Sequence, residues 1–106
     1  MRWAVTLALL LLPLAVAPVV PSVAQDSAEQ GKQYFMNSGC YGCHTVGRMG
    51  TPIGPDLSHV GAKYPLAYLQ RWLRDPAEQR PSAHMPALEL SEAQVAALAA
   101  YLSSLR

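Results

Sequence analysis

Two cysteines and a histidine stand together in the segment Cys40-Tyr41-Gly42-Cys43-His44, and the chain has no other cysteine. Two residues between the cysteines correspond to about one helical turn, so both sulfur atoms can face one edge of a flat macrocycle. Each sulfur can form a thioether with a haem vinyl group, and the adjacent His44 can offer an imidazole nitrogen to the iron. The motif therefore predicts one covalent haem c, with His44 as an iron ligand.

Other uses of a close cysteine pair fit this sequence less well. A thioredoxin-like dithiol lies beside a βαβ pattern, and no alternating run of β-branched residues predicts a strand here. A zinc site needs about four protein ligands, but no second Cys/His pair follows, and His59 and His84 repeat no zinc-finger spacing. A disulfide between Cys40 and Cys43 would close a loop too small to stabilise the domain.

Three segments predict helices, at residues 27–37, 65–74 and 91–105. The first and third begin with the spacing of a capping box, in Ser27/Gln30 and Ser91/Gln94. The other sequence signal is apolar residues at helical spacing, which are Leu66, Leu69 and Leu73 in the second segment and Val95, Leu98, Leu102 and Leu105 in the third.

Between these helices lie two long loops, residues 46–63 and 76–90, both rich in proline or glycine. Loops of this length normally count against a compact domain. They are reasonable if they wrap a large flat apolar ligand. The sequence thus predicts one small all-α domain that is completed by its cofactor.

Residues 1–24 have the order of an export signal peptide: a basic start at Arg2, an apolar run, and the small residues Ser22-Val23-Ala24 as a cleavage site. Cleavage after Ala24 would leave residues 25–106 as the mature domain. An alternative keeps residues 3–20 as an uncleaved membrane anchor, since that run approaches spanning length.

The charge balance indicates no strongly charged partner. Without Arg2, the seven remaining basic residues balance the seven acidic ones. No basic stripe favours nucleic acid and no acidic tail favours a charge-driven partner. We therefore expect redox partner proteins and no nucleic acid.

On the basis of the Cys40–His44 motif and the predicted helices, the chain resembles class I cytochrome c of the short bacterial type, from Gly31 to Tyr101. The resemblance implies a small cytochrome c fold, with three main helices and long loops wrapped around one covalent haem. It also implies that the first helix crosses the last through Gly31, Phe35, Leu98 and Tyr101. The implied function is single-electron transfer in the periplasm, as a shuttle or as the haem subunit of a larger redox complex, and not enzymatic catalysis by this chain itself.

The second iron ligand has several candidates, which are Met36, Met49, Met85, His59 and His84. Met36 is typical of a side chain that fills space on the first helix, and Met49 follows the haem motif too closely to reach the opposite face. His84 is the second choice because imidazole also binds iron, although a single histidine in a loop, like His59, is more often solvated. Met85 is followed by Pro86 in the second long loop, which resembles the distal Met-Pro of the family. If Met85 did not bind iron, the alternative would be an open-site haem protein, peroxidase-like or gas-binding.

The resemblance also assigns residues around the haem. Gly54-Pro55-Asp56-Leu57 matches a Gly-Pro-x-Leu stretch, in which the Pro55 carbonyl would accept the second ring N–H of His44 and Leu57 would press on the haem. Trp72 resembles a tryptophan that lies near a haem propionate, and its indole can only donate a hydrogen bond.

Overall fold

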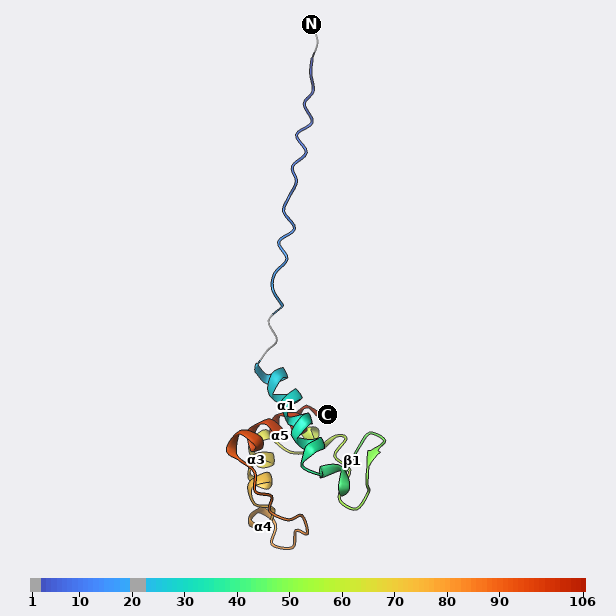
Figure 1. The fold of residues 1–106 in the computed structure, drawn as a ribbon, viewed down its shortest axis with the longest axis vertical. Helices are drawn as coiled ribbons and strands as arrows, with labels where there is room; N and C mark the ends of the chain where they lie inside the picture. Colours follow the sequence, from blue (N-terminus) through green and yellow to red (C-terminus); the bar gives the residue numbers. More distant parts are fainter. Residues whose placement is uncertain (1–2, 20–22) are drawn as a thin grey trace.

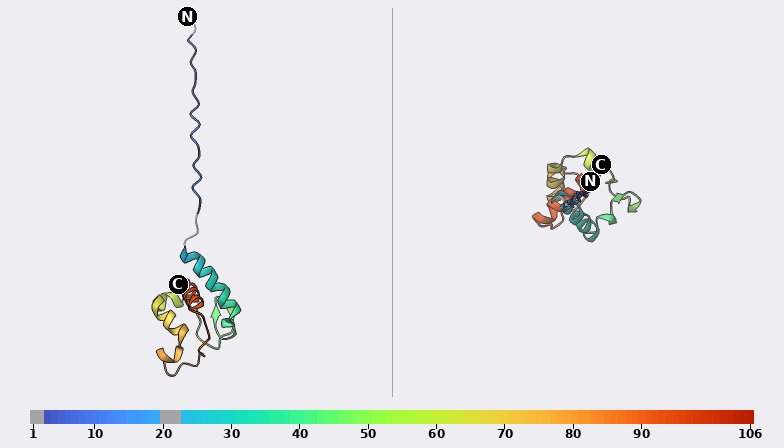
Figure 2. Two further views of the ribbon diagram at one scale, coloured as in Figure 1. Left: turned by 60° about the vertical axis from the view of Figure 1, so that its left-hand side comes forward. Right: turned by 90° about the horizontal axis from the view of Figure 1, so that it is seen from above.

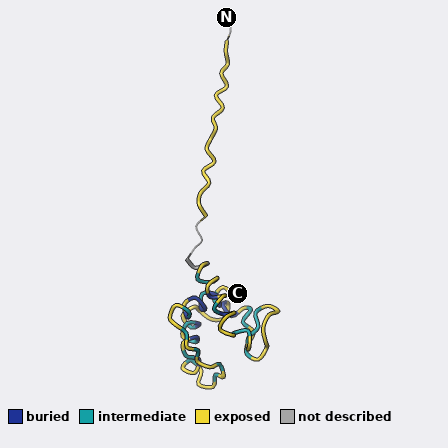
Figure 3. The backbone as a smooth tube through the Cα atoms, in the orientation of Figure 1, coloured by how far each residue is buried: buried dark blue, intermediate teal, exposed yellow. Residues whose placement is uncertain are grey.

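The computed structural model describes residues 3–19 and 23–106 of the 106-residue chain. Residues 3–19 form an extended, exposed segment that leads to a folded helical domain (Figures 1 and 3). Arg2, Val20 and Ser22, which belong to the predicted signal or anchor, lie outside the described residues. In the described part of the chain, no helix combines the length and apolar character needed to cross a membrane.

The centre of the domain is the crossing of its first and last helices, α1 (Val23–Asn37) and α5 (Glu92–Ser104), which Figures 1 and 2 show lying across one another. The backbones come so close that a Cβ added to Gly31 would overlap the carbonyl oxygen of Ala97 and lie 2.8 Å from the Cβ of Tyr101. Only glycine allows such an approach. Phe35, on the next turn of α1, is buried against the edge of the Tyr101 ring.

Helix α3 (Leu66–Arg74) completes the core by placing Leu69 and Leu73 against α5. Figure 3 shows the buried residues gathered where these helices meet. The buried members of the cluster are Phe35, Val60, Leu69, Leu73, Val95, Leu98, Ala99, Tyr101 and Leu102. Most of the core therefore comes from the predicted helical stripes, but Leu66 of the second stripe is 45% exposed and Val60 comes from the segment predicted as loop.

Two one-turn helices lie in the long loops. Helix α2 (Val60–Lys63) precedes α3, and helix α4 (Pro76–Gln79) follows it. Proline at the first position of α4 suits a helix start because that position needs no N–H, and the Asp75 carboxylate caps the helix by accepting from the Glu78 N–H at 3.3 Å. The aspartate-proline pair thus ends α3 and starts α4.

The haem-motif segment follows α1 directly. Gly39, in the left-handed region at φ 78°, turns the chain into the 3-10 helix η1 (Cys40–Gly42). A small antiparallel hairpin then forms from β1 (Thr45–Val46) and β2 (Met49–Gly50). This hairpin contradicts the expectation of no strand, because two-residue strands are too short to show an alternating pattern.

The first residues of α1 and α5 test the two capping boxes that the sequence predicts. Helix α5 begins as expected, with a full capping box between Ser91 and Gln94. The capping box predicted at Ser27 and Gln30 is wrong, because α1 starts four residues earlier at Val23 and Ser27 lies inside it. Asp26 in the first turn favours this earlier start through the helix dipole.

Candidate functional site

The two cysteines of the motif lie at the two ends of one short turn, Cys40 at the start of η1 and Cys43 directly after it, and both are free. Cys43 is exposed, whereas Cys40 is half-buried against the core, and this burial raises the pKa of the Cys40 thiol. Two free thiols on one short turn suit attachment to two points on one ligand edge.

His44 is held by a hydrogen bond across the loop. Its Nδ1 donates to the carbonyl oxygen of Pro55 at 2.8 Å. A carbonyl oxygen only accepts, so the ring proton sits on Nδ1 and the lone pair of Nε2 is free to bind a metal. A metal-ligating histidine usually has such a partner, which fixes the tautomer and the ring plane.

Gly54 makes room for this arrangement. A Cβ at position 54 would lie 2.9 Å from Cε1 and 3.1 Å from Nδ1 of His44. The Gly54 N–H also donates to the Cys43 carbonyl oxygen at 2.5 Å. The glycine of the Gly-Pro-x-Leu stretch therefore has a steric role that the sequence pattern alone did not reveal.

Met85 lies in the second long loop, half-buried against the core cluster. Its sulfur accepts a hydrogen bond from the indole Nε1–H of Trp72 at 3.2 Å. Trp72 in turn ends a row of stacked rings. Tyr64, which follows α2, stacks on Tyr68 of α3 at a centroid distance of 4.7 Å, and Tyr68 stacks on Trp72 at 6.2 Å. The protein thus orients the Met85 thioether through a positioned donor.

The other four candidate ligands are exposed to solvent. Met36 and Met49 are 48% and 59% exposed. His84 is exposed, and so is His59, whose Nδ1 lies 3.1 Å from the Arg106 carbonyl oxygen. Of the five candidates, only Met85 is both half-buried and packed against the same core as Cys40 and Leu57.

The expected contact of Trp72 with a haem propionate stays a prediction, since the indole N–H here points to sulfur. Leu57 is half-buried beside the core, which suits its predicted role against the haem. Two further residues, Asp56 and Ser58, join this loop to the haem motif through hydrogen bonds. Their Asp-x-Ser spacing is typical of a side chain that bonds the backbone two residues on. It could have predicted the local bond from the Ser58 N–H to Asp56, but not the bonds to Thr45 and Gly47.

The residues present fit a covalent haem and not a metal ion bound by protein alone. The thiols of Cys40 and Cys43 would suit covalent attachment of a c-type haem, and Nε2 of His44 and the thioether of Met85 are groups that could bind its iron. Among the described residues, no group of three or more histidine, cysteine or carboxylate side chains could hold a metal ion.

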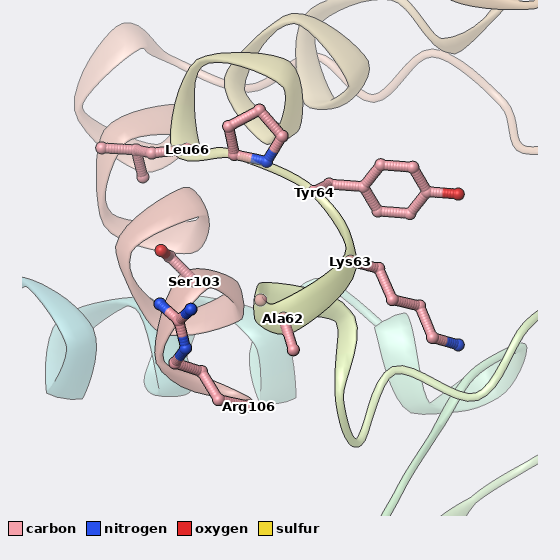
Figure 4. Close-up of a pocket in the computed structure, with 8 residues that line it drawn as sticks. Ala62, Lys63, Tyr64, Leu66, Ser103 and Arg106 are labelled. Atoms are coloured by element: carbon pink, nitrogen blue, oxygen red, sulfur yellow. The ribbon is translucent and has the colours of Figure 1, made fainter.

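A hollow at the far end of α5 carries no comparable chemistry. It is lined by residues 61–66, Ser103 and Arg106. Figure 4 shows the side chains of Lys63 and Tyr64 pointing away from it. The chemistry-bearing residues are therefore those of the motif and of the loop that carries Met85.

Comparison with known protein families matches residues 28–106 to the family described as Cytochrome c. The chain belongs to the cytochrome c family. Membership confirms the predicted small helical fold, the covalent haem c and the role as a carrier of single electrons. Cytochrome c domains act outside the cytoplasm, which agrees with the predicted export.

Two curated relatives are both called cytochrome c oxidase subunit 2. The one from Alkalihalophilus pseudofirmus is 39% identical over 96 residues, covering 82% of this chain and 28% of the relative. The one from Bacillus sp. strain PS3 is 32% identical over 105 residues, covering 81% of this chain and 28% of the relative. This cytochrome c chain therefore spans little more than a quarter of the length of these relatives. No solved structure matches it significantly.

Proposed function

We propose that this cytochrome c carries single electrons to a membrane-bound terminal oxidase, with haem c attached through Cys40 and Cys43 and iron held between His44 and Met85. The observation that carries the ligand assignment is the 2.8 Å hydrogen bond from His44 Nδ1 to Pro55, which leaves Nε2 for the metal. The partner assignment rests on the relatives, in which a similar domain occurs within an oxidase subunit.

On one side of the haem, His44 acts as a fixed ligand. The Pro55 carbonyl holds the ring plane and increases the basicity of Nε2. Gly54 allows the ring to lie against the loop without a steric clash. The ligand thus needs little rearrangement when the iron changes charge.

On the other side, Met85 supplies a neutral sulfur that favours ferrous iron and raises the reduction potential. Trp72 orients that sulfur through its N–H. The bound haem supplies reversible one-electron chemistry. Two protein ligands leave no open position, so the arrangement favours electron transfer over catalysis on a bound substrate.

We further propose that residues 1–24 direct export, and that residues 25–106 act in the periplasm, free or tethered to the outer face of the inner membrane. The apolar segment at residues 3–19 supports either cleavage or anchoring. The similarity to oxidase subunits supports a place of action at the membrane surface.

The test uses the purified holoprotein and membranes that contain a terminal oxidase. The ferrous protein should be six-coordinate and low-spin, should fail to bind carbon monoxide rapidly, and should be reoxidised by the membranes with matching oxygen uptake. A high-spin ferrous protein that binds carbon monoxide at once would instead support the open-site alternative. A low-spin protein that oxidase-containing membranes cannot reoxidise would contradict the partner assignment.

A further inference from the structure

The stretch around Pro55 is hydrogen-bonded to the end of the haem motif and to the residues that follow it. Residues 43–47 run beside residues 54–58, and successive hydrogen bonds join the two segments. Apart from the His44–Pro55 bond, these are Gly54 N to Cys43 O at 2.5 Å, Leu57 N to Thr45 O at 2.8 Å, Thr45 Oγ1 to Asp56 Oδ1 at 3.0 Å and Gly47 N to Ser58 Oγ at 2.8 Å. The pairing keeps an offset of 11 or 12 residues throughout.

Asp56 is the junction of this network. Its Oδ1 accepts from the Thr45 hydroxyl at 3.0 Å, the Ser58 N–H at 3.2 Å and the Ser58 hydroxyl at 2.7 Å. We call Thr45, Gly47, Asp56 and Ser58 the Asp56 clasp. The hydrogen bonds from Ser58 and then Thr45 lower the pKa of the Asp56 carboxyl, with a small contribution from the charge of His59. The carboxylate is therefore charged under ordinary conditions and acts as a strong acceptor.

The clasp is connected to the iron ligand through a single peptide group. The Pro55 carbonyl oxygen that accepts from His44 belongs to the planar peptide unit whose nitrogen is that of Asp56. Fixing the Asp56 side chain on Thr45 and Ser58 therefore restricts rotation of that peptide plane.

We propose that Asp56 is a positioning residue that holds the Pro55 carbonyl on His44 and thereby lowers the reduction potential of the haem iron. The inference rests on the proposed ligation by His44 and extends it to a residue that does not touch the ligand. A firmly held acceptor increases the electron donation of the imidazole, which favours ferric iron. A nearby negative charge acts in the same direction.

The experiment separates position from charge with three variants of the holoprotein. Ser58→Ala removes the hydroxyl that donates to Asp56 and accepts from Gly47, keeps the backbone N–H donor and changes no charge. Asp56→Asn removes the charge and keeps an acceptor oxygen. Glu89→Gln, at an exposed carboxylate outside the clasp, is the control for loss of one negative charge.

Two readouts report on the ligand itself: the reduction potential, and the exchange rate of the His44 Nδ1 proton measured by NMR in the ferrous state. We expect Ser58→Ala to speed exchange at least tenfold and to raise the potential. We expect Asp56→Asn to raise the potential more than Glu89→Gln does, while Glu89→Gln leaves exchange unchanged.

The proposal is overturned if Ser58→Ala changes neither exchange nor potential, or if Asp56→Asn and Glu89→Gln shift the potential equally. Either result would mean that Asp56 contributes charge alone or nothing. The axial ligation is read from the wild-type spectrum before the variants are compared. Failure of the proposed function would therefore appear in the wild type, and failure of the clasp only in the comparison.

Discussion

The Nδ1 atom of His44 lies 2.8 Å from the carbonyl oxygen of Pro55, eleven residues further along the chain. This contact ties the haem motif to the loop that follows it and selects the tautomer in which Nε2 can bind iron. It also joins the Cys-x-x-Cys-His motif to the Gly-Pro-x-Leu stretch, through the backbone acceptor that the family resemblance implied.

Replacing Met85 with alanine tests the second ligand. Met85→Ala should keep the covalent haem but open one iron position, and the potential should fall by a sizeable part of the ~0.8 V over which axial ligands tune haem. The sulfur–iron band at the red end of the ferric spectrum should disappear. Met49→Ala, at an exposed methionine, is the matched control and should change neither measurement. An unchanged spin state in Met85→Ala would show that the ligand is another residue.

Trp72→Phe tests the hydrogen bond to the sulfur. Without the indole N–H, the Met85 lone pairs are more available to the iron, so ferric iron should be favoured and the potential should fall by a small fraction of the Met85→Ala shift. The protein should remain low-spin. Tyr68→Phe keeps the stacking ring and serves as control. A potential in Trp72→Phe equal to that of the wild type would mean that the bond does not influence the iron.

Gly31→Ala tests the helix crossing. The added methyl group would overlap the Ala97 carbonyl oxygen, so α1 and α5 must move apart. The expected loss in the free energy of unfolding is about 1–3 kcal/mol, as for other overpacked sites. Urea unfolding of the holoprotein measures it. Lys32→Ala, at the exposed neighbouring residue, should cost well under that amount, and equal losses in both variants would rule out the crossing as the cause.

The raised pKa of Tyr101 predicts how the free energy of unfolding falls at alkaline pH. Burial, with the Tyr41 phenol nearby, raises the pKa of Tyr101 from 10.0 to about 12. The folded state therefore binds the phenol proton more tightly than the unfolded state does, and the resulting stability is complete below pH 10 and lost as the pH rises towards 12. Unfolding midpoints across this window should fall less steeply in Tyr101→Phe than in the wild type. Parallel curves would contradict the assignment.

The helical core was largely predictable because its signals are local. Gly31 and Phe35 on one helix, and Leu98 and Tyr101 on another, repeat at helical spacing, and the structure packs them together at the crossing. The start of α1 was missed because Ser27 can occupy a cap or the first turns of a helix equally well, and only tertiary packing decides.

The site was predictable where the chemistry is carried by rare side chains and less so where it is carried by backbone. The Cys-x-x-Cys-His spacing identifies Cys40, Cys43 and His44 as haem-attachment residues. The Asp56 clasp depends on how residues 43–47 and 54–58 approach each other in space, and the contact of Trp72 with the Met85 sulfur depends on how the second long loop packs on α3. Serine and aspartate are common in loops for many reasons, so their presence alone predicted no contact with the motif.

The most direct test of the account is the mass of the protein after maturation in a host that attaches haem c. The polypeptide should keep the visible absorption of haem after denaturation, because the haem is covalently attached. Its mass should exceed that of its amino acids by one haem bound through both Cys40 and Cys43. A colourless protein with the mass of its amino acids alone would contradict the assignment of the site and of the function built on it.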